Sequence, residues 1–478
     1  FNPNYAEYKD YLAELPFFGK KEIDLSETQD FEAIRLFKDS FPDIALRYKI
    51  SLPKIGEVES GVETLEFDSL SKSEFSKLTS LLRYLPNLRE ISIGNLGEGE
   101  SFNLEELSSF RESFPDLKFN VQSLILGSLS AENFTDLSSL FEYLPGIKEL
   151  NLGNLGGDSS FKANDLLSLK SKYPETTFTG KYEFHGKVFD LTDSVVDINH
   201  IRLSDNGDEI LALALCMPNL EFLDMDSCGI PNERMAEIRD ALPNAKVVWR
   251  IWFGRDYTVR TDVETILASY SKPSTNILRN HNVQPLKYCR DVKNLDLGHN
   301  FITDISFISE MKNLEVCILA LNSWSDLSPI ANCTNITYLE IADTNLDNLE
   351  PLRNLKKLKN LNIGNNKNLS DISPLYDLDL DALWLGCYHK VPKEQIWDYW
   401  HKFRDCEFNI TTPDSWDQGW RADKRYYPII DIFRYLDRPI PYNLYWLDPL
   451  VQPQDMVDRD NFLKEMAEVG EYPEYELK

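Results

Sequence analysis

A nine-residue pattern that recurs every 22 residues constrains the fold of this chain more than any other feature of its sequence. VKNLDLGHN is followed 22 residues later by LEVCILALN, and five copies in all start at Val292, Leu314, Ile336, Leu358 and Leu380. In each copy the first, fourth and sixth positions are apolar, and this alternation is typical of a short, half-buried strand. Five strands at one spacing predict a stack of repeats.

Two further positions recur with these strands. The ninth position favours asparagine, whose side chain can hydrogen-bond the backbone of neighbouring turns; it holds Asn300, Asn322, Thr344 and Asn366. Proline recurs in the segment after the strand, at Pro329, Pro351 and Pro374, with Phe307 at the matching place in the first copy. Because proline prevents a long helix, we expect a short return after each strand.

This is the leucine-rich repeat pattern, and the copies resemble the 22-residue internalin-like repeats of bacterial surface proteins. The strand pattern also recurs upstream at less regular spacing, from Val62, Leu88, Val121, Ile147, Ile198 and Leu220. Inserts between these strands, such as SKSEFSKLTSLLRYL, carry apolar residues at helical spacing and predict a helix behind each strand. The resemblance covers roughly residues 60–400, and it specifies a fold rather than a function.

The resemblance implies an α/β fold, a right-handed leucine-rich repeat solenoid in the form of a horseshoe or arc. Parallel strands would line the concave face, with helices outside in the N-terminal half, short 3-10 or extended returns in the C-terminal half, and a cap at each end.

We divide the chain into an N-terminal cap, long repeats with helices, a connecting repeat that continues the stack, 22-residue repeats, and an aromatic-rich C-terminal repeat and cap. The five ranges are 1–60, 61–250, 251–290, 291–386 and 387–478. In the last range, PDSWDQGWRADKRYYPIIDIFR is similar to the ends of exported leucine-rich repeat proteins of gut Firmicutes.

The charge of the chain excludes one class of partner. Lysine and arginine total 50 against 78 aspartate and glutamate, a net charge of −28, which would repel the phosphates of a nucleic acid. The sequence contains no run of 18 apolar residues, so it predicts no transmembrane segment. The chain starts with FNPNYAEYKD rather than a leader. The resemblance implies an extracellular or cell-surface protein whose signal or anchor lies outside this chain, and a cytoplasmic location stays open.

The cysteines and histidines do not form a recognisable chemical site. The seven cysteines include no CxxC pair, and the repeat register places Cys289, Cys317 and Cys333 at apolar positions, which predicts reduced, buried thiols. The six histidines lack metal-ligand spacing, and the motifs HExxH, GxSxG and GxxxxGKS/T are missing. We therefore expect no enzyme activity, no cofactor and no metal.

The third and fifth positions of each copy flank the core leucine, so their side chains point to the open face of the strands. Large apolar residues there predict a partner-binding patch, formed by Val316, Ile318, Leu321, Tyr338 and Trp384. Acidic residues rim this patch and predict a protein ligand with basic residues; they are Asp296, Glu340 and Asp343. The alternative is that a loop or the C-terminal segment folds back and buries these side chains.

These observations favour a non-catalytic protein-binding scaffold of a bacterial surface or secreted protein, which recognises its partner through the concave face. The alternative is a carbohydrate or cell-wall binding module, because the C-terminal region is rich in aromatic residues that could stack on a glycan, including Trp397, Trp400, Trp416 and Trp420. The same side chains would also serve to cap the open end of a solenoid.

Overall fold

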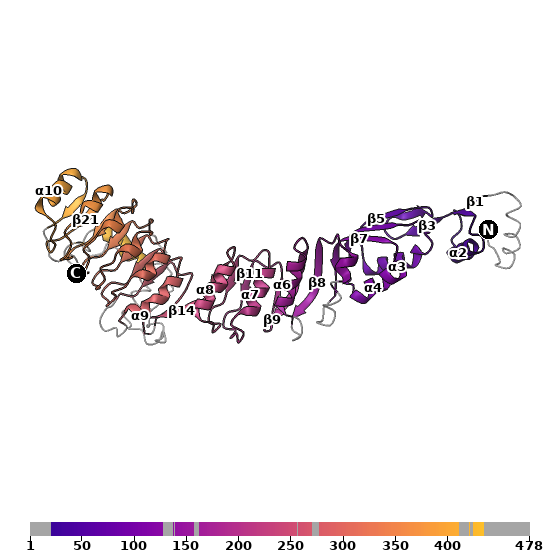
Figure 1. The fold of residues 1–478 in the computed structure, drawn as a ribbon, viewed down its shortest axis with the longest axis horizontal. Coiled ribbons are helices and arrows are strands. Elements are labelled where there is room, and N and C mark those ends of the chain that lie inside the picture. The colour runs from indigo at the N-terminus through magenta and orange to yellow at the C-terminus, as the bar shows by residue number, and fades with distance from the viewer. Residues whose placement is uncertain are drawn as a thin grey trace, which may run out of the picture. The chain divides into compact units, whose positions relative to one another are not determined.

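The computed structural model describes residues 21–127, 137, 139–156, 162–255, 257–269, 277–410, 420 and 424–434. The chain divides into unit 1, Phe1–Val196 with Gly207–Glu221, and unit 2, Asp197–Asn206 with Phe222–Lys478. In each unit, strands alternate with helical segments along the chain (Figure 1). Parts of both predicted caps lie outside the described residues, namely 1–20, 411–419 with Trp416, 421–423 and 435–478.

Unit 1 begins with small elements, which are β1 (Glu22–Asp24), α2 (Phe31–Ser40), β2 (Ala45–Arg47), β3 (Lys49–Leu52) and β4 (Gly56–Glu59). β1 and β2 pair in parallel, and β3 and β4 form an antiparallel hairpin. α2 begins after Asp30, whose carboxylate accepts a hydrogen bond from the backbone N–H of Ala33. Such an acceptor satisfies one of the free N–H groups at a helix start.

A six-stranded sheet forms the body of unit 1. Its strands are β5 (Thr64–Leu70), β6 (Glu90–Leu96), β7 (Lys118–Ile125), β8 (Glu149–Gly156), β9 (Thr177–Phe184) and β10 (Lys187–Asp190). β5 to β9 are parallel neighbours in chain order, and β10 runs antiparallel to β9. Alternate apolar residues are buried, for example Leu65 and Phe67 in β5, so one face of the sheet forms the core.

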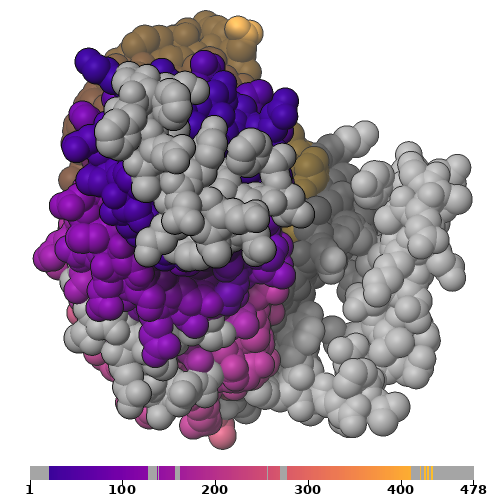
Figure 2. Space-filling view, turned by 90° about the vertical axis from the view of Figure 1, so that its right-hand side faces the viewer, coloured from indigo at the N-terminus to yellow at the C-terminus, as the bar shows by residue number. Residues whose placement is uncertain are grey.

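Helices accompany these strands, as the inserts predict. They are α3 (Lys72–Leu82), α4 (Leu104–Ser113), α6 (Ala163–Lys172) and α7 (Asp208–Cys216), and the short strand β11 (Val195–Asp197) precedes α7. α3 begins at a capping box of Ser71 and Glu74 and buries Phe75, Leu78 and Leu82, which are apolar positions of the predicted helix. Figure 1 shows α3 and α4 beside the strands, and Figure 2 shows the surface of the described residues of unit 1 in indigo to magenta.

Unit 2 contains a hairpin that the repeat pattern does not predict. After β12 (Phe222–Asp224), α8 (Asn232–Ala241) and β13 (Lys246–Val248), the strands β14 (Arg250–Phe253) and β15 (Tyr257–Arg260) pair antiparallel. The prediction that residues 251–290 continue the parallel stack is therefore wrong here. Only residues 254–256 separate the two strands, whereas a parallel crossover requires about a dozen, and Gly254 takes a φ of 61° in the turn.

The 22-residue repeats form a seven-stranded parallel sheet. Its strands are β16 (Thr265–Leu267), β17 (Asn294–Asp296), β18 (Val316–Ile318), β19 (Tyr338–Glu340), β20 (Asn360–Asn362), β21 (Ala382–Trp384) and β22 (Glu407–Asn409). From β17 to β21, register partners stand 22 residues apart, as in Asn294, Val316 and Tyr338, which confirms the predicted register. The middle residue of each of these strands, such as Leu339, is buried in the core of the stack.

Short helices provide the returns. They are α9 (Asn280–Val283) with η2 (Gln284–Tyr288), then η3 (Ser306–Glu310), η4 (Ser328–Ile330), η5 (Glu350–Leu352) and η6 (Ser373–Asp377). Proline stands in the first turn of η4, η5 and η6, where its missing N–H has no partner to lose. The last return is the longer α10 (Lys393–Lys402), and η8 (Lys424–Tyr426) and α11 (Tyr427–Arg434) end the described chain.

A ladder of buried asparagines joins neighbouring repeats. Nδ2 of Asn322 donates to the backbone oxygen of Leu297 in the preceding repeat, and its Oδ1 accepts from the N–H of Ile302, both at 3.0 Å. Asn366 repeats this role, and Thr344 donates from Oγ1 to Oδ1 of Asn366 at 2.8 Å. These bonds satisfy backbone groups where the chain leaves each strand inside the stack.

Candidate functional site

The parallel sheet of unit 2 presents two rows of side chains on the side opposite its core, because side chains alternate along a strand. The rows consist of Asn294, Val316, Tyr338, Asn360 and Ala382, and of Asp296, Ile318, Glu340, Asn362 and Trp384. These are the third and fifth positions of the sequence pattern, so the pattern assigned them to the correct side. We call these two rows the strand face.

The predicted exposure of the strand face is wrong. Four of the five predicted apolar residues are almost fully buried, with exposed fractions of 3% for Val316, 0% for Ile318, 2% for Tyr338 and 7% for Trp384. They share one apolar cluster with residues of the C-terminal segment, Trp420, Ile429 and Phe433. The structure thus shows the alternative arrangement, in which the C-terminal segment folds back over the strands.

α11 packs on the strand face because its apolar residues gather on one side. Ile429 and Phe433 stand four residues apart, and such residues lie one above the other on a helix. Both are buried in the cluster, and Tyr426 and Ile432 are partly buried beside them. An amphipathic helix gains stability by burying this kind of stripe, so the strands and α11 cover each other's apolar side chains.

Trp420 joins the C-terminal segment to the strand face. Its indole N–H donates to the hydroxyl of Tyr338, and the two ring centroids lie 5.6 Å apart. The same indole meets Trp384 edge-on, at a centroid distance of 6.2 Å and an interplanar angle of 78°. Further along the segment, Nη2 of Arg425 donates to Oε2 of Glu407 in β22 at 2.6 Å. Polar and apolar contacts therefore hold the same segment.

The residues of the predicted acidic rim do not share one environment. Glu340 and Asp296 are buried, so the prediction of an open acidic rim is wrong for these two. Tyr338 donates from its hydroxyl to Oε2 of Glu340 at 3.2 Å, and Oδ1 of Asp296 accepts a backbone N–H two residues later at 2.9 Å. Asp343 and Leu321 are half-buried and follow the strands with φ values of 53° and 56°.

Three polar atoms of the strand face are buried and have no hydrogen-bond partner among the described residues, namely Asn360 Oδ1, Asn362 Nδ2 and Trp384 Nε1. Asn362 and Trp384 are register partners on β20 and β21. Each unpaired buried polar atom costs about 1–3 kcal/mol. A cavity of about 10 Å³, close to the size of one water, is lined by Tyr338, Asn360, Trp420, Arg425 and Tyr426.

A charge cluster that the repeat pattern does not reveal lies around β12, β14 and β15. Nη1 of Arg260 donates to Oδ2 of Asp224 at 2.8 Å and its Nε to Oδ1 of Asp262 at 3.1 Å, while Nη2 of Arg250 donates to Oδ2 of Asp226 at 2.7 Å. Burial alone would raise the pKa of Asp226, but hydrogen bonds to its carboxylate, above all from Arg250, lower that pKa. Three carboxylates neutralise two guanidinium groups, so the cluster stabilises the fold and leaves no excess positive charge for an anion.

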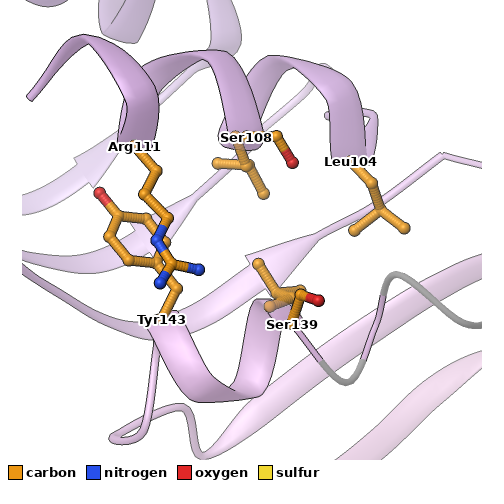
Figure 3. A pocket seen from close by; sticks show the side chains of 7 residues that line it. Leu104, Ser108, Arg111, Ser139 and Tyr143 are labelled. Atoms are coloured by element: carbon orange, nitrogen blue, oxygen red, sulfur yellow. The ribbon is translucent and has the colours of Figure 1, made fainter. Parts of the chain in front are cut away.

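Unit 1 contains a cavity of about 120 Å³ beside α4 (Figure 3), lined by Leu104, Leu107, Ser108, Arg111, Ser139, Leu140 and Tyr143. The guanidinium carbon of Arg111 lies 5.2 Å from the centroid of the Tyr143 ring. Burial raises the pKa of Tyr143 to about 12, with Arg111 opposing the shift. The described lining contains two serines and one cation, Arg111, and no histidine.

Within the described ranges, no group of three or more His, Cys, Asp or Glu side chains is arranged to hold a metal ion. In the same part of the chain, no helix is both long enough and apolar enough to cross a membrane.

No family model and no curated protein matches this chain. Among solved structures, an internalin from Listeria monocytogenes is 18% identical, over 70% of this chain and 78% of that one, with a TM-score of 0.27. Internalin C2 of the same bacterium is 19% identical over 50% and 71% of the two chains, with a TM-score of 0.19. A leucine-rich repeat protein of Leptospira interrogans is 17% identical over 73% and 93%, with a TM-score of 0.25.

Similarities at TM-scores this low transfer no function to the chain. The assignment of its fold therefore rests on its own repeats. Five copies recur at a 22-residue period, their strands pair in register at the same offset, and buried asparagines bond one repeat to the next. Residues 292–385 therefore have the leucine-rich repeat architecture of the internalin-like type.

Proposed function

We propose that this chain is a non-catalytic scaffold that binds a protein partner through the strand face, as part of a bacterial surface or secreted protein. The proposal includes a right-handed solenoid whose strands line the concave face, and it assigns no catalytic residue, cofactor or metal. Once the C-terminal segment has left the strand face, the residues that contact the partner are Val316, Ile318, Leu321, Tyr338 and Trp384, with Asp296, Glu340 and Asp343 orienting it.

One observation carries this proposal, namely that the strand face already holds a helix. The outward side chains of β18, β19 and β21 are not needed for the core of the repeats, yet they include large apolar residues that pack against Ile429 and Phe433. A surface that accepts two apolar anchors at helical spacing has the chemistry of a helix-binding groove. The partner is therefore expected to offer apolar anchors, and basic residues for the nearby carboxylates.

The test is capture of a partner by the full chain and by paired variants. Ile318→Ala with Tyr338→Ala removes two anchors of the strand face. This double variant should weaken binding of a captured partner at least tenfold, because a few large side chains dominate such interfaces. Phe301→Ala is the matched control, since Phe301 is half exposed in the same unit and outside the cluster. Equal capture by the double variant and by the control would place the binding site elsewhere.

The second candidate is a carbohydrate or cell-wall binding module, and α10 is the element that favours it. Trp397 and Trp400 are 61% and 45% exposed, and their ring centroids are 5.5 Å apart. Exposed aromatic rings can stack on sugars, whereas Trp420 is only 5% exposed and Trp416 lies outside the described residues. A glycan array signal lost in Trp397→Ala with Trp400→Ala, and kept in Ile410→Ala, would support this candidate.

A further inference from the structure

We propose that the strand face is a docking site for an amphipathic helix of the partner, and that α11 is an internal ligand which this helix must displace. The inference rests on the proposed function and adds to it the kind of partner and the means by which binding is controlled. In the present arrangement the site is closed, because the anchors of the strand face are buried under the C-terminal segment.

The contacts of α11 define what a competing helix must carry. It needs two apolar side chains four residues apart, in the places of Ile429 and Phe433, and an aromatic residue upstream that reaches Tyr338 as Trp420 does. It also needs a basic residue near its start, since Arg425 pairs with Glu407 at the edge of the sheet. The segment thus has the chemistry that the sequence predicts for a partner, apolar anchors with basic residues beside them.

Two features make α11 replaceable. Its described part has eight residues, fewer than helices that persist alone in water, so the helical state of this part depends on the strand face. While α11 is docked, Asn360 Oδ1, Asn362 Nδ2 and Trp384 Nε1 have no hydrogen-bond partner among the described residues. A partner helix that brings an acceptor oxygen to the two unpaired donors would make the hydrogen bonds that α11 leaves unmade.

The experiment opens the site in the full chain and supplies the helix from outside. Ile429→Asp with Phe433→Asp places two carboxylates in the apolar cluster and should release α11. The probe is a fluorescent peptide with the sequence of residues 420–434, and its binding is followed by fluorescence anisotropy. The opened variant should bind the peptide at least tenfold more tightly than the wild type, whose site is occupied.

Two further variants locate the binding. Tyr338→Ala added to the opened variant should weaken binding of the peptide at least tenfold, because it removes the partner of the Trp420 indole. Phe301→Asp introduces a carboxylate at an exposed phenylalanine of the same unit and should behave as the wild type. Equal binding by the wild type and the opened variant, whether tight or absent, would overturn the proposal.

A folding check keeps the result interpretable. The opened variant should keep the cooperative melting of the repeats in circular dichroism, and if it does not, Phe433→Ala alone should give an affinity between those of the wild type and the opened variant. The peptide experiment needs no natural partner. Its failure would remove the internal-ligand proposal while leaving the proposed function to the capture experiment with Ile318→Ala and Tyr338→Ala.

Discussion

Trp420 donates its indole N–H to the hydroxyl of Tyr338, a residue 82 positions earlier in the chain. The bond connects a segment that has no place in the 22-residue period with the central strand of the stack. Both side chains are buried, so the bond forms in a setting where unpaired polar groups are costly. Closure of the strand face therefore depends on a specific side-chain pair as well as on apolar packing.

Replacement of Trp420 should loosen α11 without disturbing the repeats. Trp420→Phe removes the hydrogen bond and part of the ring contacts and should weaken docking by about 1–2 kcal/mol, while Trp420→Ala removes all contacts with the two rings and should cost about 3 kcal/mol. Hydrogen exchange should therefore accelerate in residues 424–434 more strongly in the alanine variant. Unchanged exchange in α11, or equal acceleration in β17 to β20, would contradict this account.

Thiol labelling of the native protein should modify Cys387 first. It is the exposed one among the described cysteines, whereas Cys289, Cys317 and Cys333 are buried and free, as the register predicts. Burial raises the pKa of the Cys333 thiol to about 11 and that of Cys317 well above its usual value, which lowers the reactive thiolate fraction. Maleimide labelling read by mass spectrometry should give one fast site, lost in Cys387→Ser. Fast labelling of the three buried thiols would show that the register is wrong.

The asparagine ladder should contribute measurably to stability. Asn322→Ala leaves the buried N–H of Ile302 without its side-chain acceptor, whereas the oxygen of Leu297 keeps the amide of Asn300 as a donor. The variant should lower the free energy of unfolding by about 2 kcal/mol. Asn345→Ala is the control, because its amide donates to the oxygen of Ser323 from an exposed position, and it should stay within about 0.5 kcal/mol of the wild type. Urea titrations would measure both, and equal losses would rule out a special role for the ladder.

Acid should weaken unit 2 through Asp226. Because hydrogen bonds to its carboxylate lower its folded-state pKa, its stabilising contribution is complete above the unfolded pKa of about 3.9 and is lost as the pH falls through the folded value. Asp226→Asn should cost about 2 kcal/mol at neutral pH, less than a fully buried pair because Arg250 is partly exposed.

The variant should also lose less stability than the wild type between pH 4 and lower pH. Asp347→Asn, a change at an exposed aspartate, is the control variant. Melting curves at stepwise lower pH would measure the loss of stability. If stability fell in parallel for the wild type and Asp226→Asn, Asp226 would not be the cause of the acid sensitivity.

The repeat period predicts strand positions and register because both depend on neighbours in sequence. Leu295, Cys317 and Leu339 are buried as the alternation requires, and prolines in the returns coincide with short 3-10 helices. The 22-residue period does not predict the hairpin of β14 and β15, although the signal of this hairpin is local. Ile251, Phe253, Tyr257 and Val259 alternate on either side of Gly254, and this is a hairpin pattern.

Burial of the strand face depends on a contact between distant segments, which no period reveals. Alternation shows that Ile318 and Tyr338 point away from the core, but it cannot show what meets them there. The helical spacing of Tyr426, Ile429 and Phe433 is readable in the sequence, yet it indicates only that some apolar surface is covered. The target of α11 follows from the geometry of the fold.

Matching strand positions 22 residues apart make the stack modular, with one exception. If residues 314–335 were excised, Asn294 would be followed by Tyr338 in the next strand, and core leucines and asparagine positions would still align. The same excision would delete Val316 and Ile318 from beneath α11. A whole repeat could thus be lost or gained with little harm to the core, while the C-terminal helix would lose its fit, so the contacts of this helix depend on which repeats lie beneath it.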